Sequence, residues 1–318
     1  MKLIELDMRR SQELVSLWNQ ELGQLFPMRR ALFEQNSFAD ENVCHASSRI
    51  AVDHNGKLIG FVVVKRWQEQ IDVGMDPEKG WIQAILVDAS YRHQGIGKAL
   101  LNNAEHALSL MGIKEIWLGR DPWHYFPGIP KEYEQVAKWF KMKGYLQQGF
   151  DYDMLCTYDI SDRITVQEHF GIEFSVLNIA EKEDLLKFMH RCFPGRWEYE
   201  TIKYFQKGGT GREFVVLKKD NRIIGFCRIN DDLTPIISQN VYWAPLFDEK
   251  LGGVGPLGID ATERKRGFGL EIVKAGIAEL RKRHIQRIVI DWTGLVDFYG
   301  KLGFDVWKTY QSYKKTIS

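Results

Sequence analysis

The residues best suited to chemistry in this chain form a short motif that occurs twice. The segment Asp88–Gly97 contains the pattern Arg-x-x-Gly-x-Gly, and Asp260–Gly269 repeats that pattern 172 residues later. Each copy follows an apolar run and precedes an amphipathic helical pattern. A helix N-terminus offers unpaired N–H groups, glycines let the backbone come close to a ligand, and arginine adds a charged donor. The motif therefore predicts two turns that each bind a phosphate group.

The repetition extends well beyond this motif. Three further pairs occur in the same order, at offsets of 167, 165 and 159 residues: Phe26-Pro27 with Phe193-Pro194, Asn55–Phe61 with Asp220–Phe226, and Gly144-Tyr145 with Gly303-Phe304. Offsets that differ only by the length of a loop indicate a tandem duplication. We therefore expect two similar domains, residues 1–160 and 168–318, joined within the polar segment 158–171.

Both halves show the same order of expected elements around the motif. Each begins with helices and a β-hairpin and continues with a central strand, the glycine turn, a long helix, a strand, a helix and a final strand or hairpin. The central strand, long helix and following strand are expected at 81–87, 97–111 and 115–118 in the first half, and at 254–259, 269–284 and 287–290 in the second.

Length and composition limit the class of protein. The 318 residues suit two domains of about 150 residues, and 43 lysines and arginines against 42 acids give a net charge of only +1. This balance predicts neither a nucleic acid nor a membrane partner. The four cysteines are scattered, which argues against a metal site or disulfides and fits a reducing compartment. The charged N-terminus resembles no signal peptide, so we expect a cytoplasmic protein; its oligomeric state is left open.

The two motif segments resemble the acetyl-CoA signature of the GNAT acetyltransferase superfamily. The similar residues are Tyr91–Leu101 and Arg264–Leu270, and the resemblance covers nearly the whole chain. It implies an α/β fold of two tandem GNAT-type acyl-CoA N-acyltransferase domains, each a mixed, mostly antiparallel sheet flanked by helices. It also implies acetyl-CoA as co-substrate.

The resemblance further implies which residues hold the coenzyme. The pyrophosphate would lie on the two turns, formed by Arg92, His93, Gln94, Gly95, Ile96 and Gly97, and by Arg264, Lys265, Arg266, Gly267, Phe268 and Gly269. The pantetheine arm would bind the splayed strand before each turn, at Ile85, Val87, Leu257 and Ile259. Pro256 and Gly258 fit a bulge in the second of these strands, because proline cannot donate to a β-ladder.

A tyrosine distinguishes the second half from the first. Transfer of acetyl to an amine releases a thiolate with a pKa of about 8.5, and a phenol with a pKa of about 10 still carries a proton for it at neutral pH. The GNAT pattern often has a tyrosine on the short helix before a Gly-Phe strand, which corresponds to Tyr299. The first half has Phe140 at that position. We therefore predict a catalytic C-terminal domain and a degenerate or structural N-terminal domain, with a packed helix aromatic as the other interpretation of Tyr299.

A general base is harder to identify from the sequence. Asp291 follows the strand 287–290, where the first half has Gly119, so this acid also belongs only to the second half. It could accept the proton of the amine or anchor an ammonium group, and a loop or capping aspartate is an equally good interpretation. Asp260 has a counterpart in Asp88, so we expect it to shape the turn.

The sequence leaves the acceptor open. Segments such as 119–130 and 291–299 resemble tandem GNAT proteins of Gram-positive bacteria, some of which acetylate glucosamine or glucosaminides. A primary amine of a small molecule, with an amino sugar such as glucosamine as the leading example, is therefore the expected acceptor. An aminoglycoside, a polyamine or a protein N-terminus are the alternatives within enzymes. A non-catalytic acyl-CoA sensor or scaffold is the alternative of a different class.

Overall fold

The structure is a computed structural model that describes residues 1–317, and the chain divides into two units. Unit 1 comprises residues 1–70 and 76–151 and the described residues from Thr309 onward. Unit 2 comprises residues 152–308 together with the short segment Ile71–Met75. Each unit thus contains a short piece of chain from the opposite half of the sequence.

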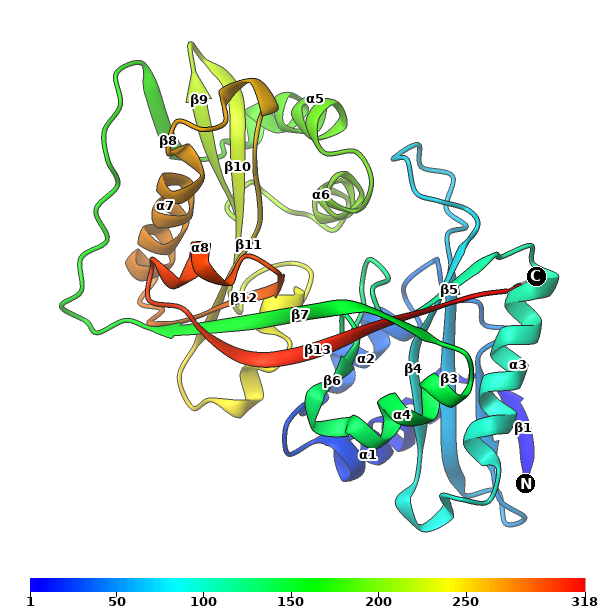
Figure 1. Ribbon diagram of the computed structural model, residues 1–318. Coiled ribbons are helices and arrows are strands. Elements are labelled where there is room, and N and C mark those ends of the chain that lie inside the picture. The colour runs from blue at the N-terminus through cyan, green and yellow to red at the C-terminus, as the bar shows by residue number, and fades with distance from the viewer. Residues whose placement is uncertain (318) are drawn as a thin grey trace. The chain divides into compact units, whose positions relative to one another are not determined.

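The N-terminal half carries the elements that the sequence led us to expect (Figure 1). Its helices and strands are β1 (Lys2–Glu5), α1 (Ser11–Leu22), α2 (Arg30–Ser37), β2 (Arg49–Val52), β3 (Leu58–Arg66), β4 (Lys79–Val87), α3 (Ile96–Leu110), β5 (Glu115–Leu118), β6 (Ile129–Pro130), α4 (Glu134–Met142) and β7 (Leu146–Thr157).

The C-terminal half repeats this order except for β6, which has no counterpart among its described residues. Its helices and strands are β8 (Ile172–Val176), α5 (Lys182–Cys192), α6 (Arg196–Gln206), β9 (Phe214–Lys219), β10 (Arg222–Asn230), β11 (Leu251–Ile259), α7 (Phe268–Lys282), β12 (Arg287–Thr293), α8 (Val296–Gly300) and β13 (Asp305–Thr316).

Strand order is the same in the sheets of the two units. Unit 1 has the order β1-β2-β3-β4-β5-β13, and unit 2 has β8-β9-β10-β11-β12-β7. In each sheet only the fourth and fifth strands are parallel, and the other neighbours are antiparallel. The mixed, mostly antiparallel sheet flanked by helices that the sequence predicted is therefore confirmed for both halves.

The last strand of each sheet comes from the opposite half of the chain. In unit 1, β13 pairs with β5, with Lys314 opposite Trp117. In unit 2, residues 152–157 of β7 pair with β12, with Thr157 opposite Arg287. The two halves of the sequence have therefore exchanged their final strands.

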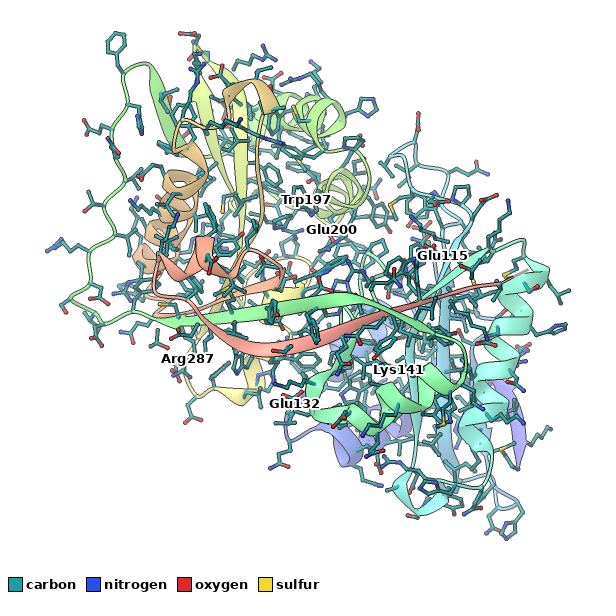
Figure 2. The ribbon with its side chains drawn as sticks, viewed as in Figure 1. Glu115, Glu132, Lys141, Trp197, Glu200 and Arg287 are labelled. Carbon is teal, nitrogen blue, oxygen red and sulfur yellow. The ribbon has the colours of Figure 1, made fainter. Side chains whose placement is uncertain are left out.

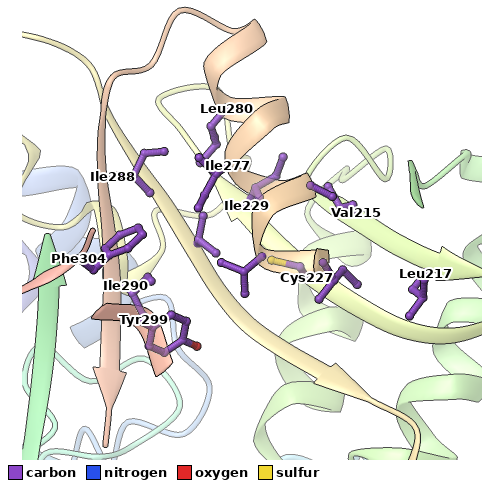
Figure 3. Close-up of a cluster of buried hydrophobic side chains, with 14 of the residues drawn as sticks. Val215, Leu217, Cys227, Ile229, Ile277, Leu280, Ile288, Ile290, Tyr299 and Phe304 are labelled. Carbon is purple, nitrogen blue, oxygen red and sulfur yellow. The ribbon is translucent and has the colours of Figure 1, made fainter. Parts of the chain in front are cut away.

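Alternation along the strands builds one apolar layer on each face of the sheet. In β9, Val215 and Leu217 belong to the cluster beneath α7, whereas Phe214 and Val216 belong to the cluster beneath α5. This period of two is what a strand buried on both faces requires. Figure 3 shows the α7 side, where Ile229 and Ile277 are both fully buried. Within residues 1–317 no helix combines the length and the apolar character needed to cross a bilayer.

The parallel strands separate just where the predicted coenzyme strands begin. Pairing of β4 with β5 ends at Ile82 and Leu118, and pairing of β11 with β12 ends at Gly253 and Val289. One extra residue bulges from β4 near Gln83, and another from β11 between Val254 and Leu257. The second bulge confirms the expectation from Pro256 and Gly258. Bulges bend and twist a strand locally, so they help to open a gap between the two parallel strands.

Candidate active site

The two glycine turns have nearly the same backbone. Gly95 and Gly267 precede α3 and α7 with φ angles of +82° and +83°, a left-handed conformation that glycine adopts without steric cost. His93 and Lys265, two positions earlier, also match, with φ angles of +62° and +64°. Both turns therefore present the first amides of a helix at the end of a splayed strand, as an anion-binding turn requires.

Asp88 and Asp260 shape these turns, as the sequence indicated. Each carboxylate accepts hydrogen bonds from the backbone N–H and the hydroxyl of the residue two positions on, at 2.9 and 2.8 Å for Ser90 and at 3.0 and 2.8 Å for Thr262. Burial alone would raise the pKa of Asp260, but hydrogen bonds from Thr262 and Arg191 hold it below its ordinary value. The carboxylate therefore stays charged and keeps the turn folded.

Unit 2 has a cavity of about 320 Å³ at its turn. Seven of its lining residues are those expected to hold the coenzyme: Leu257, Ile259, Arg264, Lys265, Gly267, Phe268 and Gly269. Arg266 does not line it and instead pairs with Glu263 at 3.2 Å. Phe193, which follows α5, and Trp197 of α6 also line this cavity.

Unit 1 has a larger cavity, of about 740 Å³, in the corresponding place. It extends from the turn along β4 to Gly119 and Phe140. The expected residues that line it are Ile85, Val87, Arg92, His93, Gly95, Ile96 and Gly97, whereas Gln94 does not. Volume alone therefore does not mark unit 2 as the working half.

A carboxylate occupies the mouth of the unit 1 cavity. Glu21 of α1, one of the lining residues, accepts a hydrogen bond from the backbone N–H of Ala89 at 3.0 Å and forms an ion pair with Arg92. Its side chain is 6% exposed, so the charge is poorly screened by water. In unit 2 the guanidinium of Arg264 donates to the carbonyl of Ile259 at 3.1 Å, and it forms no ion pair with a carboxylate in the part of the chain described. The cavity of unit 2 is also lined by a carboxylate, Glu263, but this group pairs with Lys219 and Arg266. The two turns thus differ in whether their first arginine is paired with a carboxylate.

Beside the unit 1 cavity, an aromatic cluster fills the space between α1, α2 and the loop 119–128. The ring of Trp18 lies 5.0 Å from that of Tyr125 and 5.7 Å from that of Phe126, and Phe26 lies 4.8 Å from Phe126. The ring of Phe33 stacks on Tyr125 at 6.1 Å. We call these five side chains the aromatic plug. In unit 2 only residues 294–295 separate β12 from α8, so no comparable loop occurs there.

Tyr299 lies on α8 and is 6% exposed. Figure 3 shows its ring at the border of the apolar cluster, with Ile290 and Phe304 close by. Burial raises the pKa of its hydroxyl above the ordinary value, and the carboxylate of Asp291 adds to the increase. The phenol therefore keeps its proton throughout the neutral range. The hydroxyl makes no hydrogen bond to any residue between 1 and 317.

Asp291 lies at the point where β12 leaves the sheet. The next residue, Trp292, has a φ of +42°, and its N–H donates to the carboxylate of Asp153 at 3.0 Å. The pairing of β12 with β7 shifts between Ile290 and Thr293. Burial raises the pKa of Asp291 to about 6, against the opposing charge of Arg196. This carboxyl is therefore ionised at neutral pH yet basic enough to take a proton.

Helix α6 brings further groups to this place that the sequence did not single out. The guanidinium carbon of Arg196 lies 4.2 Å from the ring centre of Trp292, and its Nε donates to Glu200 at 2.6 Å. Gln239 donates to the same carboxylate oxygen at 3.4 Å. The only sequence signal was the Arg-x-x-x-Glu spacing of α6, which usually marks an exposed ion pair.

No cluster of three or more His, Cys, Asp or Glu side chains that could hold a metal occurs in residues 1–317. The groups near β12 are thus a carboxylic acid and a phenol, neither of which lines the cavity at the turn of unit 2. A carboxylate of raised pKa can accept a proton, and a protonated phenol can donate one. Such an arrangement suits transfer of a group from a phosphate-bearing carrier to an acceptor that must lose a proton.

Comparison with known proteins gives one family. A family model described as the acetyltransferase (GNAT) family matches residues 12–126 and 182–304. No curated protein matches the sequence.

Solved structures match the fold along nearly the whole chain. The GCN5-related glucosamine N-acetyltransferase region of a fungal multi-domain GH3 β-N-acetylglucosaminidase is 22% identical with a TM-score of 0.87, and the match covers 98% of this chain but 38% of the fungal one. A GCN5-related N-acetyltransferase from Sphaerobacter thermophilus is 13% identical with a TM-score of 0.73, covering 99% and 95%. A tandem GNAT protein from the clavulanic acid biosynthesis pathway is 12% identical with a TM-score of 0.69, covering 99% and 98%.

Proposed function

The chain belongs to the acetyltransferase (GNAT) family as a tandem N-acetyltransferase, and we propose that unit 2 transfers acetyl from acetyl-CoA to a primary amine of a small molecule. The observation that carries this proposal is that unit 2 contains Tyr299 and Asp291 as well as an anion-binding turn, whereas unit 1 has Phe140 and Gly119 at the equivalent positions. The four scattered cysteines, all unpaired, favour the cytoplasm as its compartment.

The residues of unit 2 fit coenzyme A in character. Backbone amides at the start of α7 would hold the pyrophosphate, with Lys265 lining the same cavity. The apolar wall of Leu257, Phe193 and Trp197 suits a pantetheine arm. The free edge of β11 beyond Gly253 supplies backbone groups for that arm.

The chemical step moves one acetyl group and balances its protons. The amine nitrogen bonds to the carbonyl carbon of the thioester, and the bond from that carbon to sulfur breaks. Asp291 accepts the proton that the amine loses, directly or through water, since its raised pKa makes it a stronger base than an exposed aspartate. Tyr299 donates its hydroxyl hydrogen to the departing sulfur. The proton held by Asp291 then returns to the Tyr299 oxygen through solvent, so both residues regain their starting protonation states.

For unit 1 we propose coenzyme A binding without transfer. Like unit 2, it has a cavity next to a glycine turn with a left-handed φ angle, which supports binding. Phe140 has no proton to donate, and Gly119 has no carboxylate. Non-catalytic acyl-CoA binding, which the sequence offered as an alternative function for the whole chain, is therefore proposed for unit 1 alone.

Glucosamine is the first acceptor to test. The similar fungal region is described as a glucosamine N-acetyltransferase, and the carboxylates and amides around Asp291 are hydrogen-bonding partners for a polyhydroxylated amine. An aminoglycoside, a polyamine and a protein N-terminus remain as the other acceptors.

The test is release of free thiol from acetyl-CoA in the presence of a panel of amines. Glucosamine, chitobiose, an aminoglycoside, spermine and a short peptide cover the classes above. We expect thiol release that depends on acceptor, together with an acetylated product found by mass spectrometry. Two bound equivalents of acetyl-CoA by calorimetry without acceptor-dependent release would instead favour a sensor.

A further inference from the structure

Glu200 of α6 is a buried carboxylate with an unused oxygen next to the proposed point of transfer. It is 1% exposed. One oxygen receives Arg196 Nε at 2.6 Å and Gln239 at 3.4 Å, whereas Oε2 has no hydrogen-bond partner among residues 1–317. A charged oxygen that is buried without a partner is costly, so it marks a place where a hydrogen-bond donor is missing.

Helical spacing places this oxygen near both the coenzyme cavity and Asp291. Trp197 lines the coenzyme cavity, and Glu200 lies three residues further on in α6; Figure 2 labels both residues. Residues three apart in a helix are neighbours on its surface. Arg196, four residues before Glu200, covers the ring of Trp292, whose neighbour in the chain is Asp291. Trp197, Arg196 and Glu200 of α6 therefore extend from the coenzyme cavity to the surroundings of Asp291, the proposed base.

The segment 239–240 provides a second connection between the surroundings of Glu200 and those of Asp291. Gln239 donates to Glu200, and its neighbour Asn240 lies against β11, where a Cβ on Gly253 would come within 2.0 Å of the Asn240 amide oxygen. Gly253 pairs with Val289 of β12, two residues before Asp291. Glu200 and Asp291 thus border one polar region built from α6, the segment 239–240 and β12.

We propose that Glu200 is an acceptor-binding residue, whose free oxygen receives a hydrogen bond from a second donor beside the reacting amine. This inference rests on the proposed function. Asp291 would accept the proton of the reacting nitrogen. Glu200 therefore recognises a neighbouring hydroxyl or ammonium group of the acceptor. The enzyme would therefore select amines that carry such a donor over plain alkylamines.

The experiment compares three amines that differ in the second donor they offer. Glucosamine offers hydroxyls, putrescine offers a second ammonium, and cyclohexylamine offers neither. We expect the wild type to prefer glucosamine or putrescine over cyclohexylamine. Glu200→Gln should lower kcat/KM for the preferred amine about 10-fold, mainly through KM, as loss of a hydrogen bond to a charged group does. Activity toward cyclohexylamine should fall much less than activity toward the preferred amine.

Glu198 provides a matched control on the same helix. It is 4% exposed and also has one unpartnered oxygen, but its other oxygen lies 2.7 Å from Nδ1 of His190 on α5. Glu198→Gln should leave the preference among the three amines intact. Glu200→Asp, which keeps the charge but shortens the side chain, should give an intermediate preference and thereby exclude misfolding as the cause.

The outcomes separate this inference from the proposed function. Arg228 Nε is also buried without a partner, so a water shared with Glu200 would satisfy both groups. In that case Glu200→Gln would change thermal stability and leave the amine preference unchanged, which would overturn the inference. If no amine releases thiol, the proposed function fails. Calorimetry of the same amines with the coenzyme A complex would then still show whether binding depends on Glu200.

Discussion

Phe140 and Tyr299 occupy equivalent positions in the two units. The ring of Phe140 stands edge-on to that of Trp139 at 4.8 Å and 77°, and the ring of Tyr299 stands edge-on to that of Phe298 at 4.9 Å and 79°. Each is followed, five residues later, by a buried aromatic after a left-handed glycine. The hydroxyl group is therefore the main chemical difference between these two packing sites.

Replacement of Tyr299 by phenylalanine should reduce kcat by about 100-fold or more, because the departing sulfur loses its hydrogen-bond donor. Stability should change little, since the hydroxyl makes no hydrogen bond within residues 1–317. Thiol release and thermal unfolding measure the two effects. Phe140→Tyr is the matched control, and it should add no activity. Full turnover by Tyr299→Phe would remove this residue from the mechanism.

The pH dependence of the rate should follow Asp291. Its pKa is raised to about 6, so the basic form predominates only above that pH, and kcat/KM should fall as the pH drops below 6. Asp291→Asn should be slow at all pH values and should lack this limb of the profile. A wild-type limb that persists in the variant would assign it to another group.

The Asp291 carboxyl should also make the stability of the folded protein decrease as the pH rises. Because its pKa is higher in the folded protein than in the unfolded chain, the folded state binds the proton more tightly between about pH 4 and 6. Its contribution to stability is present below pH 4 and is lost as the pH rises through 6. The melting temperature of the wild type, relative to Asp291→Asn, should therefore decrease across this window.

Gly95 and Gly267 allow a matched test of which unit works. Both have a left-handed φ, and a Cβ on either would meet open space, so valine should cost each unit a similar 1–2 kcal/mol or somewhat more through backbone strain. Gly267→Val should abolish turnover. Gly95→Val should remove one equivalent of bound coenzyme A in calorimetry and leave kcat/KM unchanged. Loss of turnover in Gly95→Val would show that unit 1 takes part in transfer.

The sequence predicted the parts of the fold that depend on local patterns. The glycines at 95 and 267 and the capping aspartates at 88 and 260 are local requirements of a turn, so their repetition was sufficient to find both turns. The exchange of β7 and β13 was not predictable, because an alternating strand shows which of its faces is buried but not which sheet it joins.

The polar groups around Asp291 were missed for a related reason. Arg196, Glu200 and Gln239 come from elements far apart in sequence from Asp291, and each has an ordinary role when considered alone. The aromatic plug was also hidden, since buried rings in a loop look like core residues. Only the tertiary structure brings the members of each of these two groups together.

Glu21 gives the sharpest expectation for unit 1. Its carboxylate lines the cavity and pairs with Arg92, so an incoming pyrophosphate must compete with it and meets a like charge. Glu21→Gln should strengthen coenzyme A binding in unit 1 by roughly 2- to 5-fold, equivalent to about 0.5–1 kcal/mol. The Gly267→Val background silences the site of unit 2, so calorimetry then reports unit 1 alone.

Glu13 supplies the control for this prediction, because it lies on the same helix and pairs with Arg10 rather than with the turn. Glu13→Gln should leave the affinity of unit 1 unchanged. The gain from Glu21→Gln should depend only weakly on salt, since a carboxylate that is 6% exposed is poorly screened by ions. Weaker binding in Glu21→Gln would mean instead that Glu21 holds Arg92 and the N–H of Ala89 in the conformation that receives the coenzyme.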